Sequence, residues 1–82
     1  MKTWRQLEEL AARDHFHLHR PTKDLGAGVT ICEESGMHEP LLSIVASGLD
    51  DRDADIVTRE ATEAGLRALR NIDRDRTEVT RG

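Results

Sequence analysis

Apolar and polar side chains alternate along residues 15–19, where His15, His17 and His19 are separated by Phe16 and Leu18. A period of two residues is typical of a β-strand whose two faces have different surroundings. We therefore expect a strand that directs Phe16 and Leu18 toward a core and the three histidines toward the opposite face.

Two further stretches have strand character. Residues 29–33 place Val29 and Ile31 on one face, and residues 41–47 are apolar on both faces. Turn-forming residues separate these stretches, and short connections between successive strands favour an antiparallel meander. The expected turn and break positions are Pro21, Gly26, Gly28, Ser35, Gly36, Pro40 and Gly48.

Helical periodicity flanks the strands. Thr3 and Gln6 form a capping-box pattern that opens a helix ending near Asp14, with Trp4, Leu7, Leu10 and Ala11 on its inner face. A second helix is expected over 51–72, where a close crossing over the sheet would explain Gly65. Its expected inner stripe is Ile56, Ala61, Ala64, Gly65, Ala68, Leu69 and Ile72.

These elements predict an α+β fold in the order α-β-β-β-α, with a three-stranded antiparallel sheet and two helices packed on one face. We expect residues 1–72 to form a single domain and residues 73–82 to be a charged, flexible tail, with an edge strand over 77–80 as an alternative.

Composition narrows the class of protein. Aromatic residues are 2% of the chain, so the core must be aliphatic, and a core this small favours self-association as a homodimer. A net charge of −4 without a basic stripe argues against nucleic-acid binding. One cysteine, no apolar signal core and no membrane-length apolar run favour a soluble cytoplasmic protein without membrane contact.

The open face of the predicted sheet is the main candidate site. Three interpretations compete: a solvated face, an interface with a protein partner or a second copy, and a metal site. The apolar members make the interface the leading interpretation. The expected face consists of His15, His17, His19, Thr30, Cys32, Leu41, Ser43 and Val45.

A metal site would use the histidine ladder, because His-x-His on a strand places two imidazoles on one side and Cys32 can lie across the hairpin. The candidates are His15, His17, His19 and Cys32, but no supporting carboxylate is evident nearby. His38 falls in a predicted loop, where we expect it to be solvated.

Other motifs are weaker. Asp51, Asp53 and Asp55 imitate the start of an EF-hand calcium loop, but Ile56 and Thr62 occupy the glycine and glutamate positions, so we interpret the acids as favourable charge at a helix N-terminus. The glycines at 26 and 28 precede a strand, which argues against a phosphate loop. We interpret Cys32 as an inert, half-buried thiol and expect no enzyme and no cofactor.

The α-β-β-β-α order resembles the double-stranded RNA-binding domain over most of the chain. That family carries a lysine-rich cluster at the start of its second helix, whereas this chain has acidic residues across 50–55. The resemblance therefore implies a fold and not the RNA-binding function. The small size, acidic balance and lack of catalytic motifs also look like those of phage and prophage accessory proteins.

The sequence thus predicts a small non-enzymatic protein-interaction module, similar to a phage-encoded accessory protein, that binds another protein or itself through the open sheet face. The alternative is a metal-binding protein using the histidine ladder with Cys32. The second alternative is a nucleic-acid-binding domain with the topology of a double-stranded RNA-binding domain.

Overall fold

A computed structural model describes residues 1–20, 28–34, 36–37 and 39–81, with side chains as far as Ile72. Its element order confirms the predicted α+β fold and the α-β-β-β-α sequence. The predictions for Pro21, the glycine at 26, Ser35 and His38 lie outside the described residues. The elements are α1 (Trp4–Arg13), β1 (Phe16–His19), β2 (Gly28–Glu33), β3 (Pro40–Val45) and α2 (Asp51–Arg81).

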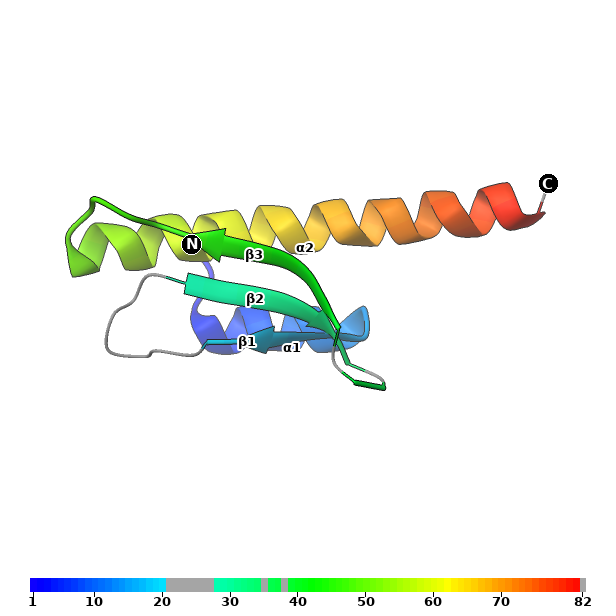
Figure 1. The fold of residues 1–82 in the computed structure, drawn as a ribbon, viewed down its shortest axis with the longest axis horizontal. Coiled ribbons are helices and arrows are strands. Elements are labelled where there is room, and N and C mark those ends of the chain that lie inside the picture. Colours follow the sequence, from blue (N-terminus) through cyan, green and yellow to red (C-terminus); the bar gives the residue numbers. More distant parts are fainter. Residues whose placement is uncertain (21–27, 35, 38, 82) are drawn as a thin grey trace.

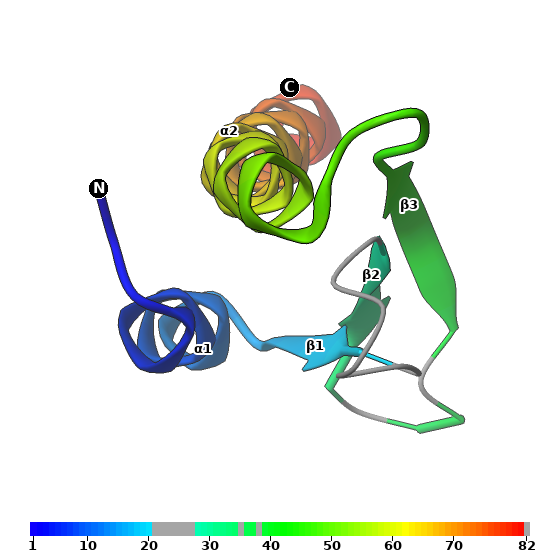
Figure 2. The same cartoon turned by 90° about the vertical axis from the view of Figure 1, so that its left-hand side faces the viewer.

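Within the described residues, the sheet has three antiparallel strands in the order β1-β2-β3. Both helices lie on one face of this sheet, as Figure 2 shows, with α1 beside β1 and α2 over β2 and β3. In Figure 1 the long α2 helix extends well beyond the strands toward the C-terminus. The opposite face of the sheet is therefore covered by neither helix.

The core lies between the sheet and the helices. Phe16 and Leu18 point into it, as their alternation predicted, with Leu18 buried and Phe16 partly buried. Trp4 and Leu10 of α1 pack against the same cluster. The buried hydrophobic residues of this cluster are Leu7, Ala11, Leu18, Val29, Ile31 and Leu66.

Helix α1 begins as predicted and ends in a way that changes the histidine stretch. The Thr3 hydroxyl accepts a hydrogen bond from the Gln6 backbone N–H, and the Gln6 side chain accepts one from the Thr3 N–H, which completes the capping box. At the other end, His15 adopts a φ of 63°, the left-handed conformation that commonly terminates a helix. β1 therefore starts at Phe16, and the prediction of a single strand over 15–19 is wrong for His15.

Helix α2 begins at Asp51, after the Asp50 carboxylate accepts a hydrogen bond of 2.8 Å from the Asp53 backbone N–H. It continues to Arg81, so the expected end at Ile72 and the alternative strand over 77–80 are both wrong. Its 31 residues correspond to a rod of about 46 Å. Residues 73–81, expected as a tail, continue the backbone of this helix.

The buried face of α2 differs from the predicted inner stripe. Thr58 and Thr62 are fully buried together with Ala54 and Leu66, whereas Ala64, Ala68 and Ile72 are exposed. The Thr62 hydroxyl donates to the Thr58 backbone carbonyl at 2.7 Å, which lets a polar residue enter the core.

Gly65 does lie where the helix crosses the sheet closely. A Cβ atom at this position would stand 2.7 Å from Leu42 Cδ2 and 3.2 Å from Ile31 Cδ1. The close crossing predicted from the glycine is confirmed.

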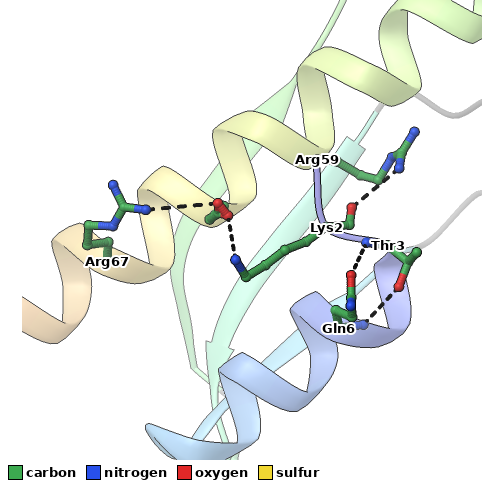
Figure 3. Close-up of polar contacts among 6 residues, drawn as sticks. Lys2, Thr3, Gln6, Arg59 and Arg67 are labelled. Atoms are coloured by element: carbon green, nitrogen blue, oxygen red, sulfur yellow. Dashed lines mark hydrogen bonds and ion pairs between the residues drawn. The ribbon is translucent and has the colours of Figure 1, made fainter.

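A set of polar contacts ties the start of the chain to the middle of α2. The Trp4 indole N–H donates to Asp55 Oδ1 at 2.8 Å, and Arg59 holds the other oxygen of the same carboxylate at 2.9 Å. Figure 3 shows Lys2 beside α2, where its carbonyl accepts a hydrogen bond from Arg59 and its ammonium pairs with Glu63 at 3.3 Å. These contacts fix α1 against α2 at the edge of the core.

Spanning a bilayer takes about 20 consecutive apolar residues. Neither α1 nor α2 offers such a run in the part of the chain that the structure describes.

Candidate functional site

The open face of the sheet forms a shallow hollow of about 540 Å³. All three strands contribute to it, because alternate residues of each strand point away from the helices. The register places His17 opposite Cys32 and Thr30 between His19 and Ser43. We call this the open-face hollow, and its lining residues are His17, His19, Thr30, Cys32, Pro40 and Ser43.

The polar groups of the open-face hollow form a small hydrogen-bonding surface. The hydroxyls of Thr30 and Ser43 lie 3.4 Å apart across the β2–β3 pair, so one donates to the other. His17 and His19 are both exposed on β1. The hollow therefore offers two imidazoles and two hydroxyls to whatever contacts it.

Cys32 is the least accessible member of the hollow. Its residue is 7% exposed, and its thiol donates a long hydrogen bond of 4.0 Å to the Thr30 carbonyl. A buried thiol directed at a backbone carbonyl behaves as a small hydrophobic group. Cys32 thus forms the floor of the hollow, between His17 of β1 and Pro40 of β3.

Three of the predicted face residues lie outside the hollow. His15 sits at the end of α1, where its Nδ1 is 4.0 Å from Glu34 Oε2. Leu41 lies at a β-bulge, because Ile31 pairs with Leu42 while the next residue, Cys32, pairs with Pro40. Val45 stands opposite Gly28 at the end of β3 and is 75% exposed.

Pro40 is the lining residue that sequence reasoning missed. It was expected to close a turn, but it begins β3 and pairs with Cys32. Proline in a sheet is confined to strand starts, edges and bulges, and this one is at the start of an edge strand beside a bulge. That preference was the signal in the sequence from which the position of Pro40 at a strand start could have been predicted.

The geometry of a metal site is met only in part. His17 and Cys32 are opposed across β1 and β2, as a shared ligand set requires. Among the described side chains, no group of three or more His, Cys, Asp or Glu residues is placed to hold a metal ion.

The acidic start of α2 has a structural role. Asp51 and Asp53 occupy its first turn, where the partial positive charge of the helix N-terminus stabilises them. Asp55 instead accepts a hydrogen bond from the Trp4 indole and forms an ion pair with Arg59. The interpretation of these acids as helix N-terminal charge is confirmed for Asp51 and Asp53, while Asp55 anchors α1.

A second hollow, of about 160 Å³, lies between α1 and α2. Its charged lining residues are Lys2 and Asp14, which flank α1, and Glu63, Arg67 and Arg70 of α2. Arg70 is 3.7 Å from Asp14 there, and Glu63 lies between Lys2 and Arg67. Its charges already pair within the chain, so the open-face hollow is the better candidate for a binding site.

No protein-family model, curated protein or solved structure matches the chain. The resemblance to the double-stranded RNA-binding domain therefore stays a prediction about topology.

Proposed function

We propose that the chain is a non-enzymatic protein-interaction module, of the kind that phages and prophages encode as accessory proteins, whose open sheet face binds another protein or a second copy. The observation that carries this proposal is the uncovered face itself. Both helices pack on the opposite side, and the uncovered face combines the hollow with exposed apolar side chains at Leu41 and Val45.

The chemistry of this face suits a mixed interface. Val45 is 75% exposed and Leu41 39% exposed, and removing such side chains from water contributes favourably to association. The imidazoles of His17 and His19 supply hydrogen bonds that restrict which partner fits. A partner would present an apolar group to β3 and hydrogen-bonding groups to β1.

The test starts with capture of partners from a lysate of the source organism on immobilised protein, followed by purification of each candidate. Dissociation constants are then measured by calorimetry for the wild type and for two variants, Val45→Asp and His19→Asp. Each variant should weaken binding about tenfold or more, because it places a carboxylate in the contact area.

Met37→Asp is the matched control. Met37 is 94% exposed in the turn between β2 and β3, so the same added charge there should leave the affinity unchanged. If a purified partner binds Val45→Asp and His19→Asp as tightly as the wild type, the open face is not its binding site and the proposal is wrong.

A second candidate function is metal binding by the pair His17 and Cys32, favoured by their direct pairing across β1 and β2. Elemental analysis of protein purified without an affinity tag tests it. Stoichiometric zinc, copper or nickel that is lost in His17→Ala would support it. Protein that contains no metal, and whose melting temperature does not rise when these ions are added, would exclude it.

A further inference from the structure

The outer edge of β3 is a free strand edge, interrupted at its start by Pro40 and the bulge at Leu41. Within the described part of the sheet, β3 pairs with β2 on one side only. Its six residues carry no charged side chain, and all but Ile44 are exposed. Natural proteins usually protect such edges with charges or cover them, because a free row of backbone N–H and C=O groups pairs readily with another strand.

A second apolar surface lies on α2. Val57 is 45% exposed and Ile72 56% exposed, and the alanines between them recur at three- and four-residue spacing. This spacing places all of them on one side of the helix. We call this surface the α2 outer stripe, and it consists of Val57, Ala61, Ala64, Ala68 and Ile72.

The α2 outer stripe faces away from α1 and lies on the β3 side of the helix. Ion pairs from Glu63 and Arg70 mark the side of α2 that faces α1. Successive residues are rotated by about 100°, so the core-facing residues Thr62 and Leu66 separate that side from the stripe. Figure 2 shows that β3 lies on the far side of the sheet from α1, and α2 packs over β2 and β3. The helical rotation therefore places the stripe on the same side of the molecule as the free edge of β3.

The centres of the two surfaces coincide. Gly65 lies directly against Leu42, near the middle of β3. A twofold axis beside these residues would pair β3 with its own copy in antiparallel orientation. The same axis would place two α2 helices side by side and antiparallel, with Val57 of one copy near Ile72 of the other.

Charge also favours this arrangement. Among the exposed side chains of residues 51–60, the three acids Asp51, Asp53 and Glu60 outnumber Arg52 and make this part of α2 acidic. Arg67 and Arg70 make the following part basic. Antiparallel helices centred near Gly65 bring the acidic half of one copy beside the basic part of the other, and Glu60 near Arg67 of the other copy. Parallel helices would place like charges together instead.

We infer that the edge of β3 and the α2 outer stripe bind a second copy of this chain, forming a homodimer with a continuous six-stranded antiparallel sheet. This interface is distinct from the open-face hollow, which lies on the other side of the sheet. In this dimer, the open-face hollow of each copy would stay accessible to a partner.

The test begins with the mass of the particle in solution, measured by sedimentation and by light scattering over a range of concentrations. We expect a dimer whose dissociation constant rises about tenfold or more in Ile72→Lys, with Met37→Lys, at an exposed position of the β2–β3 turn, as a matched control that leaves it unchanged. A wild-type protein that remains monomeric up to about 1 mM would overturn the inference.

Charge exchange tests the orientation of the helices. Glu60→Arg and Arg67→Glu should each weaken the homodimer, because each creates two repulsive contacts across the twofold axis. Mixing the two variants should restore association as a heterodimer, in which both contacts are attractive. A dimer whose affinity is unaffected by either variant would overturn the antiparallel arrangement.

Crosslinking locates the axis. Ala64→Cys should form an intermolecular disulfide under mild oxidation, because Ala64 is exposed near the proposed axis. Met37→Cys, at an exposed position of the β2–β3 turn, should not. Equal crosslinking of the two variants would contradict the interface, whereas failure of open-face variants to affect a protein partner would contradict only the proposed function.

Discussion

Replacing Gly65 by alanine sets two opposing effects against each other where α2 crosses the sheet. Alanine is favoured over glycine in a helix interior by about 1 kcal/mol. The added methyl group would also stand 2.7 Å from Leu42 Cδ2, 3.2 Å from Ile31 Cδ1 and 3.7 Å from Ile44 Cδ1. The first distance is too short, so a side chain or the helix itself must move.

The size of the steric effect depends on which neighbour can yield. Leu42 is 37% exposed and can rotate toward solvent at the expense of its packing, whereas Ile31 is 0% exposed and is enclosed. Adding a methyl group to a packed core usually costs about 1–3 kcal/mol. Taking about 2 kcal/mol for the steric effect, Gly65→Ala should lower the free energy of unfolding by about 1 kcal/mol.

The assay is urea denaturation at a fixed protein concentration, since self-association would add to the apparent stability. Leu42→Ala removes the shortest contact, so in that background Gly65→Ala should become stabilising by about 0.5 kcal/mol. The coupling between the two positions should then be about 1.5 kcal/mol. Glu8→Gly compared with Glu8→Ala, at an exposed position of α1, measures the helix propensity difference alone.

The reasoning would be refuted by a simple result. If Gly65→Ala raises the free energy of unfolding by about 1 kcal/mol in both backgrounds, only helix propensity acts at this position. The close crossing would then impose no constraint on residue 65.

Two further predictions concern polar groups that are buried or partly buried. Thr58 Oγ1 is buried and has no hydrogen-bond partner among the described residues, so Thr58→Val should raise the free energy of unfolding by about 1 kcal/mol. Thr62→Val loses a hydrogen bond to the Thr58 carbonyl and should raise the free energy of unfolding by less. Equal changes for the two variants in chemical denaturation would contradict this assignment. Trp4→Phe and Asp55→Ala should each destabilise the protein, because they remove the same 2.8 Å hydrogen bond. For the same reason, a double-mutant cycle should show a coupling of about 1 kcal/mol between them. Additive effects would show that the bond does not contribute to stability.

Much of the fold follows from local patterns in the chain. The capping residues of α1 and the alternation of Phe16 and Leu18 act within a few residues, so their consequences could be predicted correctly. The face of α2 could not, because Thr58 and Thr62 are polar by type and become buried through a local backbone hydrogen bond. A prediction based on hydrophobic residues alone therefore placed residues of the neighbouring α2 outer stripe on the buried face.

The length of α2 shows a different limit. The charges after Ile72 suggested a tail, yet neither glycine nor proline occurs between Leu66 and Arg81 to end the helix. The absence of a stop signal was the more informative feature.

The candidate site was predicted in outline only. The pairing of β1, β2 and β3 brings His17, His19, Cys32 and Ser43 together as expected from alternation. His15 was misplaced because the end of α1 requires a left-handed residue there, and the bulge at Leu41 depends on pairing between strands that no single stretch reveals.

The contact between Trp4 and Asp55 joins residues separated by 51 positions, so the first helix completes its packing only after a much later segment of the chain has been synthesised. During synthesis on the ribosome, Leu18 and Ile31 cannot pack against α2 until this helix has emerged as far as Leu66. Such non-local closure slows folding relative to a chain of local contacts. The α2 helix thus emerges after α1 and the sheet, and the cooperative folding of these elements depends on its arrival.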